Sequence, residues 1–148
     1  MDTIAKLDAI ESIKRLKALY FFCMDTKDWE NFAAVFTEDC VMDMAGEAPP
    51  GVDPAMMVYR GRDQIIGAIS QGLSSFTTVH HGHTPIIDIE SEDTASGIWA
   101  MEDNFYFPDG GHMEGYGHYR DQYRKVDGQW QIAATTVTRL RKSMTPGG

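Results

Sequence analysis

The chain has 148 residues, of which 43% are apolar and 24% charged, an ordinary composition for one globular domain. Acidic residues outnumber basic ones 22 to 13, which gives a formal charge of −9. Nucleic acids and anionic membranes attract basic surfaces, so this charge argues against either as the main partner. The sequence contains no long apolar run typical of a membrane span and no basic-then-apolar secretion signal at its start. We therefore expect a cytoplasmic protein.

Helical signals fill the first half of the chain. Apolar residues recur every three or four positions over residues 3–25, which predicts a long first helix. Asp28 is a suitable N-cap for a short second helix over residues 29–36. Gly61 introduces a third helix over residues 62–73.

Strand signals follow the helices. Residues 40–44 read as a short strand, and a loop rich in proline and glycine comes next. Longer strands are predicted at 77–90, 94–107, 112–126 and 129–141, with a frayed tail at 143–148. Three helices followed by an antiparallel meander of four to five strands predict an α+β fold. A curved sheet wrapped around a long helix would leave a cavity for a small molecule.

Asp25 is the most informative residue, because it follows six consecutive apolar residues, 19–24. Helical residues advance by about 100° each, so such a run leaves no side of the helix for water. A carboxylate beside it lies near the interior, where its charge needs a partner. Asp28 stands directly before the second helix and is the better candidate for its N-cap. We therefore predict a functional role for Asp25.

Three histidines within four positions, His80, His81 and His83, are candidate partners for Asp25. Strand alternation alone favours His81 and His83 as inward-facing, and a bulge near Gly82 would favour His80 instead. Two histidines on one strand face also occur in metal sites. No carboxylate or cysteine has a spacing that would complete such a site, so we predict no metal.

Six segments carry a resemblance to a known family: residues 25–29, 36–40, 59–62, His80 with 84–85, 117–123 and 127–132. They resemble the SnoaL-like branch of the nuclear transport factor 2-like superfamily over nearly the whole chain. The resemblance implies a single domain over residues 1–148, built as a cone-shaped α+β barrel. In that fold three N-terminal helices pack in the concave face of a curved, mixed or antiparallel sheet.

Within this branch the chain is most similar to the scytalone and bile acid 7α-dehydratases, which share a catalytic Asp–His pair. The resemblance implies that Asp25 and His80 form this pair, with Tyr20 as a further catalytic residue. It also implies a role for Asp103 in the middle strand. The related dehydrochlorinase has a lysine where Tyr20 stands, so loss of water is favoured over loss of hydrogen chloride.

The predicted substrate contacts are His81, His83, His118, Arg139, Met101 and Phe105. Methionines give an adaptable apolar lining, and Phe105 shares a strand face with Asp103. Arg139, near the end of the last strand, is expected to hold an anionic or carbonyl group of the substrate at the cavity entrance. The alternative is that Arg139 has no such role and lies at an exposed strand end. His118 is a candidate second acid, for which a structural or surface role is the alternative. Both cysteines are predicted to be core thiols.

The predicted function is that of a cofactor-independent lyase of the dehydratase type. Its substrate would be a hydrophobic cyclic hydroxy-carbonyl compound or a steroid- or polyketide-like molecule. A double-bond isomerase with the same pair is one alternative, and a non-catalytic binding or dimerisation module is another. We expect no cofactor, no nucleic-acid or membrane partner, and a homodimer or homotrimer.

Overall fold

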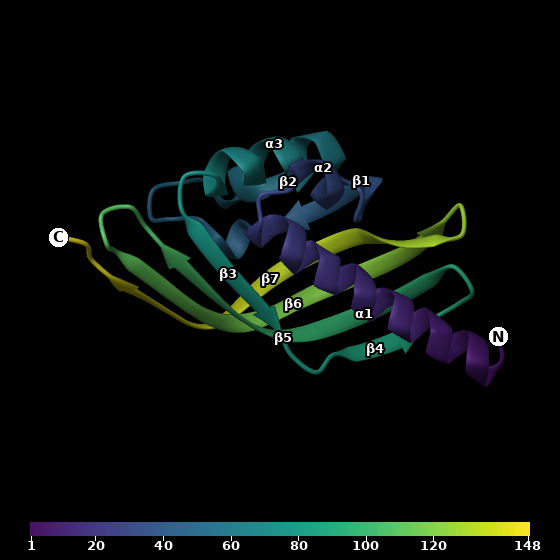
Figure 1. The fold of residues 1–148 in the computed structure, drawn as a ribbon. Helices are drawn as coiled ribbons and strands as arrows, with labels where there is room; N and C mark the ends of the chain where they lie inside the picture. Colours follow the sequence, from purple (N-terminus) through teal and green to yellow (C-terminus); the bar gives the residue numbers. More distant parts are fainter.

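The structure, a computed structural model, describes residues 1–148 and places the helices on one side of a single sheet (Figure 1). The helices are α1 (Thr3–Asp25), α2 (Trp29–Ala33) and α3 (Arg62–Leu73). The strands are β1 (Phe36–Asp43), β2 (Val58–Arg60), β3 (Thr77–Gly82), β4 (Ile86–Ile89), β5 (Thr94–Tyr106), β6 (His112–Val126) and β7 (Gln129–Thr145). Two short 3-10 helices, η1 (Ala45–Glu47) and η2 (Pro54–Met57), separate β1 from β2. No helix is both long and apolar enough to cross a membrane.

All seven strands belong to one mixed sheet with the order β2-β1-β7-β6-β5-β3, and β4 also pairs with β5. β1 runs parallel to β7, with Met42 beside Thr135, and every other pair is antiparallel. Long strands twist and coil, and here the sheet curves around α1 (Figure 1). The α+β prediction with a curved, mixed sheet and three helices is confirmed, and the cone shape stays a prediction.

Helix α1 crosses the concave face of the sheet and supplies much of the core (Figure 1). Its first turn is capped by Asp2, whose carboxylate accepts the backbone N–H of Ala5 at 2.8 Å. Its buried residues are Ala9, Ile13, Leu16, Lys17, Tyr20, Cys23 and Met24. They follow one another at helical spacing, so a single side of α1 faces the sheet. The expectation that residues 19–24 leave no side of the helix for water was therefore wrong, because Leu19 and Phe22 are exposed.

The end of α1 leaves the carboxylate of Asp25 free to face β3. The chain turns back immediately after the helix, and Lys27 has a left-handed backbone with φ of 60°. Asp28 then caps α2 by accepting the backbone N–H of Asn31 at 3.2 Å. The prediction that Asp28, and not Asp25, is the cap is therefore confirmed.

Several element boundaries differ from the sequence prediction, and β1 begins at Phe36 instead of Cys40. Helix α2 ends at Ala33, because Phe36 is drawn into β1, where it pairs with Ile132 and is fully buried. The single strand predicted over residues 77–90 is two strands, β3 and β4. Residues 83–85 between them carry Pro85, which cannot donate to a strand ladder.

The last strand is also longer than predicted. β7 continues to Thr145, which pairs with His112 at the start of β6. The prediction of a frayed tail at 143–148 was therefore wrong for residues 143–145, because β6 extends far enough to pair with them. Residues 146–148 have no regular structure.

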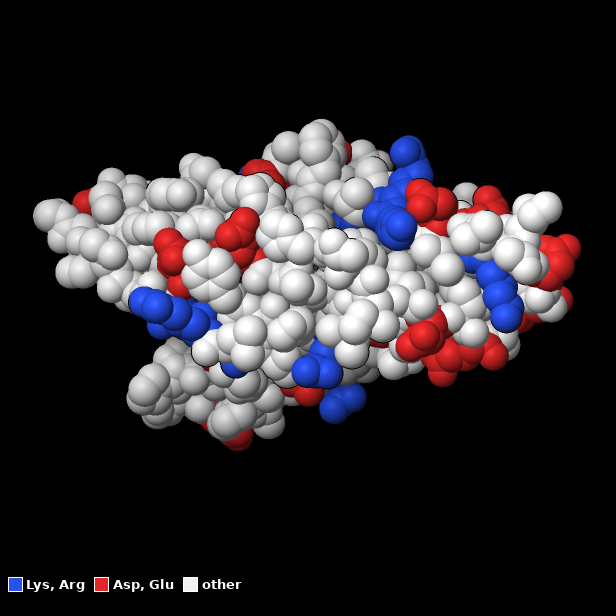
Figure 2. Space-filling view, turned by 90° about the horizontal axis from the view of Figure 1, so that it is seen from below, with Lys and Arg blue, Asp and Glu red and all other residues white.

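The net charge of −9 is not gathered in one patch on the face seen in Figure 2. Acidic and basic side chains are interspersed across it, with wide uncharged areas between them. This surface offers no basic stripe of the kind that tracks a phosphate backbone.

Candidate functional site

Asp25 and His80 meet where the end of α1 lies against β3. The Oδ1 atom of Asp25 lies 2.6 Å from Nδ1 of His80, and Oδ2 accepts the backbone N–H of His80 at 2.8 Å. The hydroxyl of Thr78 donates to Oδ1 at 3.0 Å, and it accepts a hydrogen bond from Nζ of Lys27 at 2.8 Å. The three contacts to the carboxylate all come from β3, and together they fix its orientation.

This geometry leaves one nitrogen of His80 for chemistry. Because Nδ1 faces the carboxylate, it carries the proton of the neutral imidazole, and Nε2 becomes the free base. The ring is only 6% exposed and lies between Phe21 and Phe105, with centroid distances of 6.4 and 5.7 Å. The Nε2 atom lies 4.0 Å from Oδ2 of Asp103.

Asp103, on β5, is held by a partly buried arginine, Arg139. Arg139 Nη1 donates to its Oδ1 at 2.7 Å, and Nη2 donates to Oδ2 at 3.0 Å. Gly115, opposite Asp103 on β6, makes room for this pair, because a Cβ atom there would overlap both side chains. Such a two-pronged contact fixes the plane of the carboxylate beside His80.

Arg139 also ties the sheet to the segment between β1 and β2. Its Nε donates to Oε1 of Glu47 at 2.7 Å, and Lys142 lies 3.8 Å from Oε2. Burial by itself would lower the pKa of Arg139, but hydrogen bonds to Asp103 and Glu47 outweigh burial and raise it. The guanidinium is therefore a permanent cation, already engaged by two carboxylates.

A cavity of about 330 Å³ opens beside His80 and is lined by 21 residues, of which 15 are hydrophobic. Six of them are methionines: Met24, Met42, Met44, Met57, Met113 and Met144. Methionine side chains are flexible and polarisable, so this lining adapts to the shape of an apolar ligand. The polar groups of the cavity lie among these residues, and they include His80, Asp103 and Arg139.

Two tyrosines, Tyr20 from α1 and Tyr119 from β6, line the same cavity. Their ring centroids lie 5.5 Å apart, and both residues are almost completely buried. Burial raises the pKa of Tyr20 and the pKa of Tyr119 above the ordinary value, so both phenols keep their protons. They can therefore donate hydrogen bonds to a ligand at any physiological pH.

Five of the predicted site residues line the cavity: Tyr20, His80, Asp103, Phe105 and Arg139. Asp25 is not part of the lining and contacts the cavity residue His80 from behind. Met101 is buried beneath it, with its sulfur 3.8 Å from Nη1 of Arg139. Arg139 was predicted to hold an anionic or carbonyl group of the substrate. In the structure its guanidinium instead contacts the carboxylates of Asp103 and Glu47.

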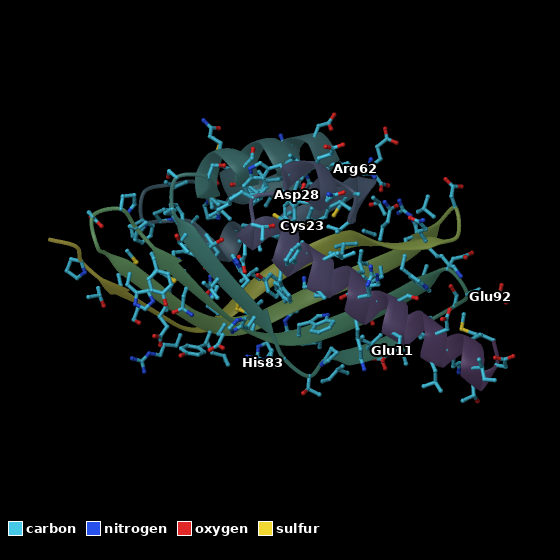
Figure 3. All side chains as sticks on the ribbon, viewed as in Figure 1. Glu11, Cys23, Asp28, Arg62, His83 and Glu92 are labelled. Atoms are coloured by element: carbon cyan, nitrogen blue, oxygen red, sulfur yellow. The ribbon has the colours of Figure 1, made fainter.

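The other histidines do not reach the cavity. The side chains of His81 and His83 are each 58% exposed, and both contact Glu102 on the opposite face of the sheet. His83 is seen on the side of the sheet away from the helices in Figure 3. His118 also lies on that outer face, between Ala100 and Thr138 of the neighbouring strands. The prediction of substrate contacts at these three residues is therefore corrected. For His81 and His83 the reason is the break after β3, which uncouples these two histidines from the alternation of Ile87. His118 faces outward by the alternation of β6, in which its neighbour Tyr119 faces the core.

The side chains of the chain form no group of three or more His, Cys, Asp or Glu residues that could hold a metal ion. On the outer face, His81 and His83 both contact Glu102. The hydrogen bond from His81 lowers the pKa of Glu102.

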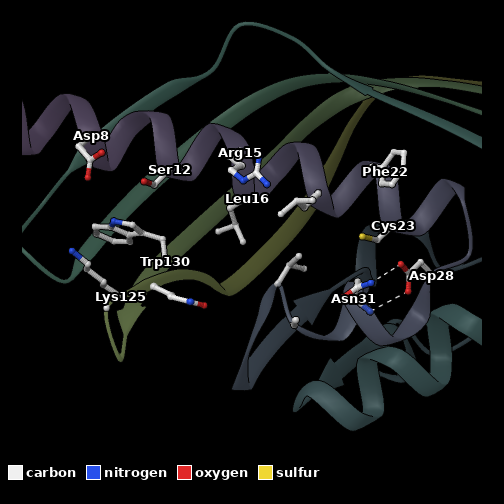
Figure 4. Close-up of a pocket in the computed structure, with 15 residues that line it drawn as sticks. Asp8, Ser12, Arg15, Leu16, Phe22, Cys23, Asp28, Asn31, Lys125 and Trp130 are labelled. Atoms are coloured by element: carbon white, nitrogen blue, oxygen red, sulfur yellow. Dashed lines mark hydrogen bonds between the residues drawn. The ribbon is translucent and has the colours of Figure 1, made fainter.

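A second hollow lies outside α1, between that helix, α2 and the turn from β6 to β7 (Figure 4). It measures about 540 Å³, and Trp130, Leu16 and Arg15 are among its lining residues. Asp28 lines it too, but this carboxylate is occupied by Asn31 as the cap of α2 (Figure 4). The hollow contains no histidine, so the inner cavity is the better candidate for acid–base chemistry.

Sequence reasoning missed four residues of this region: Tyr119, Glu47, Lys17 and Asp121. The strand alternation of Gly117, Tyr119, Asp121 and Tyr123 on the inner face was a usable signal. A lysine at position 17, in line with Ile13 and Tyr20 on the buried side of α1, was another. Glu47 had no signal, because it reaches the site from the short 3-10 helix η1 between β1 and β2.

The fold and the cavity together define a class: α+β proteins in which helices pack in a curved sheet around an enclosed small-molecule site. The SnoaL-like domain family matches residues 5–136, and this chain belongs to that family, within the nuclear transport factor 2-like superfamily.

Three solved structures illustrate the similarity. A protein of Novosphingobium aromaticivorans DSM 12444, provisionally named a scytalone dehydratase, is 26% identical, with a TM-score of 0.81 over 96% of this chain and 91% of that one. A single-residue variant of Rv3472 of Mycobacterium tuberculosis, a protein of unknown function, is 26% identical, with a TM-score of 0.76 over 92% and 74%. Hexachlorocyclohexane dehydrochlorinase LinA-type3 of Novosphingobium barchaimii LL02 is 14% identical, with a TM-score of 0.83 over 99% and 97%. The last match shows the fold alone.

Proposed function

We propose that this protein is a cofactor-independent lyase that removes water from hydrophobic cyclic hydroxy-carbonyl compounds. The observation that carries the proposal is the 2.6 Å contact between Asp25 and Nδ1 of His80, which leaves Nε2 for an apolar cavity. The provisional name of the relative from N. aromaticivorans, a scytalone dehydratase, adds support.

The reaction begins at the carbon next to the carbonyl group. Nε2 of His80 takes a proton from this carbon, and the C–H electrons move to the carbonyl oxygen to form an enolate. Asp25 keeps the imidazole oriented and stabilises the imidazolium as it forms, as the carboxylate does in an Asp–His–Ser triad. Tyr20, with Tyr119 beside it, donates a hydrogen bond to the oxygen as its charge develops.

The enolate then expels the β-hydroxyl group. The C–O bond breaks, the carbonyl and a new C=C bond form, and the leaving oxygen takes the proton from His80, so that water departs. Both terminal nitrogens of Arg139, Nη1 and Nη2, donate to Asp103. We assign Asp103 to orienting the substrate and the ring of His80. Both proton transfers therefore belong to His80, and the proton and the hydroxyl leave from the same face of the substrate.

The same arrangement suits a double-bond isomerase when the substrate has no β-hydroxyl group. One base, His80, would then take a proton from one carbon and return it to another. A non-catalytic protein that only holds an apolar ligand is the alternative from another class, and the experiment below separates it from both enzymes.

The test uses 3-hydroxy-1-tetralone, a bicyclic β-hydroxyketone that loses water to give 1-naphthol, followed by absorbance. The wild-type protein is expected to accelerate this loss, and Asp25→Asn should lower the rate by on the order of 10²–10⁴, the usual contribution of general acid–base catalysis. The matched control is Asp28→Asn, because asparagine is an equally good N-cap and this residue does not face the cavity. Full activity of Asp25→Asn would refute the mechanism, and binding without turnover by the wild-type protein would favour a binding module.

A further inference from the structure

A fully buried lysine lies in the middle of α1, where the proposed mechanism gives it no role. Lys17 is 0% exposed, and its Nζ lies 2.8 Å from Oδ2 of Asp121. Asp121 also accepts the hydroxyl of Thr135 at 2.6 Å and that of Tyr123 at 2.8 Å. These donors make Asp121 an acceptor only, as a carboxylate is, so the group beside Lys17 carries a negative charge. Burial lowers the pKa of Lys17, and the nearby charge of Asp121 opposes this lowering. The 2.8 Å contact has the length of an ammonium–carboxylate pair.

The remaining sides of the ammonium face aromatic rings. Nζ of Lys17 lies 4.0 Å from the ring centroid of Tyr20 and 3.9 Å from that of Tyr119. Apart from Asp121, it has no nitrogen or oxygen partner. The cation is thus held between the faces of two tyrosines that also line the cavity.

A cation against the face of a phenol changes the hydroxyl on that ring. Negative charge that develops on the phenol oxygen is stabilised by the nearby positive charge, and the effect is strong in a buried site with few competing waters. The O–H group therefore becomes a stronger hydrogen-bond donor, most of all toward an oxygen that itself gains negative charge.

We propose that Lys17 is a positioning residue that polarises Tyr20 and Tyr119, so that these two hydroxyls form a site for an oxyanion of the enolate or phenolate class. The other charged groups of the cavity lining already have partners of opposite charge. Asp103 is paired with Arg139, and Glu47 lies between Arg139 and Lys142. Lys17 acts from behind the tyrosines and does not touch the ligand. Its use in catalysis rests on the proposed function, but the oxyanion site itself does not.

The test uses 4-nitrophenol, whose phenolate absorbs visible light and whose neutral form does not. Bound to the wild-type protein, the probe should ionise at a lower pH than it does in free solution. In Lys17→Met/Asp121→Asn, which removes both charges and leaves neither partner buried alone, this pH should rise by about one unit, or about tenfold in the ionisation constant. In a Tyr20→Phe/Tyr119→Phe background the same double substitution should have no further effect, because Lys17 acts through the hydroxyls.

The matched control is Lys14→Met, which removes the same charge from the exposed side of the same helix and should leave the probe unchanged. A purely structural role for Lys17 predicts equal ionisation in the wild-type protein and the double variant, and that result would overturn the inference. A wild-type protein that binds no ionised probe would overturn it too. If the probe responds as expected but 3-hydroxy-1-tetralone is not dehydrated, the proposed function fails and the inference stands.

Discussion

Gly115 is a residue whose missing side chain shapes the site. A Cβ atom there would overlap Nη1 of Arg139 and Oδ1 of Asp103, so the two-pronged contact needs glycine at this position. We predict that Gly115→Ala lowers the free energy of unfolding by roughly 1–3 kcal/mol, as overpacking of a core does. Its dehydration rate should fall as well, since Asp103 moves relative to His80.

Urea unfolding of the two proteins checks the stability. The matched control is Gly67→Ala on α3, where an added Cβ meets nothing within 4 Å. Alanine is the better helix former, so this control should gain up to about 1 kcal/mol. Unchanged stability of Gly115→Ala would mean that the Asp103–Arg139 pair adapts without cost.

At the same scale, the sequence predicted the residues whose chemistry conflicts with their surroundings. Asp25 was recognisable because an apolar run precedes it, and its partner His80 because the family resemblance favoured that histidine. Tyr119 and Lys17 each carried a local signal, the alternation of β6 and a charge on the apolar side of α1, but neither signal names the partner across the core. Glu47 escaped because its long-range contacts, made from the short 3-10 helix η1, leave no local trace.

The pairing of Asp25 with His80 depends on how closely α1 approaches β3. Gly82, the last residue of β3, marks this approach, because a Cβ atom there would lie 2.5 Å from Cε2 of Phe21 on α1. We predict that Gly82→Ala pushes the end of α1 outward, stretches the Asp25–His80 contact and lowers the dehydration rate at least about tenfold, which corresponds to about 1.4 kcal/mol.

A second variant separates this effect from simple loss of folding. In Gly82→Ala/Phe21→Leu the smaller side chain gives the new methyl group space, so part of the lost rate should return. Dehydration of 3-hydroxy-1-tetralone and the circular dichroism spectrum are measured on both proteins. Wild-type turnover by Gly82→Ala would contradict the importance of this close approach.

Among the elements, the long ones were predictable and the pairings were not. Helical spacing over residues 3–25 and strand alternation over 112–126 are strong local signals, and the structure has both elements. The parallel pairing of β1 with β7 joins segments about ninety residues apart, which no local pattern encodes. The split of the predicted strand 77–90 into β3 and β4 was missed, because a proline shows where a ladder is interrupted but not for how long.

At the scale of the whole molecule, the buried thiol of Cys40 links stability to pH. Both cysteines are free and buried, as predicted. Burial raises the pKa of Cys40 to about 12, and the nearby carboxylates of Asp121 and Asp39 contribute to this rise. An unfolded thiol ionises near pH 8.5, so the unfolded state loses its proton first. This contribution to stability is therefore complete below about pH 8.5 and is lost as the pH rises toward 12.

Urea unfolding at about pH 8 and about pH 10, on either side of the ordinary thiol pKa, tests this linkage. The free energy of unfolding should fall more between these pH values in the wild-type protein than in Cys40→Ala, which lacks the thiol. Other titrating groups are the same in both proteins and cancel in the comparison. Equal losses in the two proteins would contradict the raised pKa of Cys40.

The most direct test of the central claim follows the proton itself. In deuterated water, the wild-type protein should exchange hydrogen for deuterium at C2 of 1-tetralone, a ketone without a leaving group, and from one face only. His80→Asn should slow this exchange by on the order of 10²-fold or more, because asparagine cannot accept the proton. The exchange is followed by proton NMR of the ketone. Equal exchange rates in the wild-type protein and His80→Asn would show that the Asp25–His80 pair is not the base.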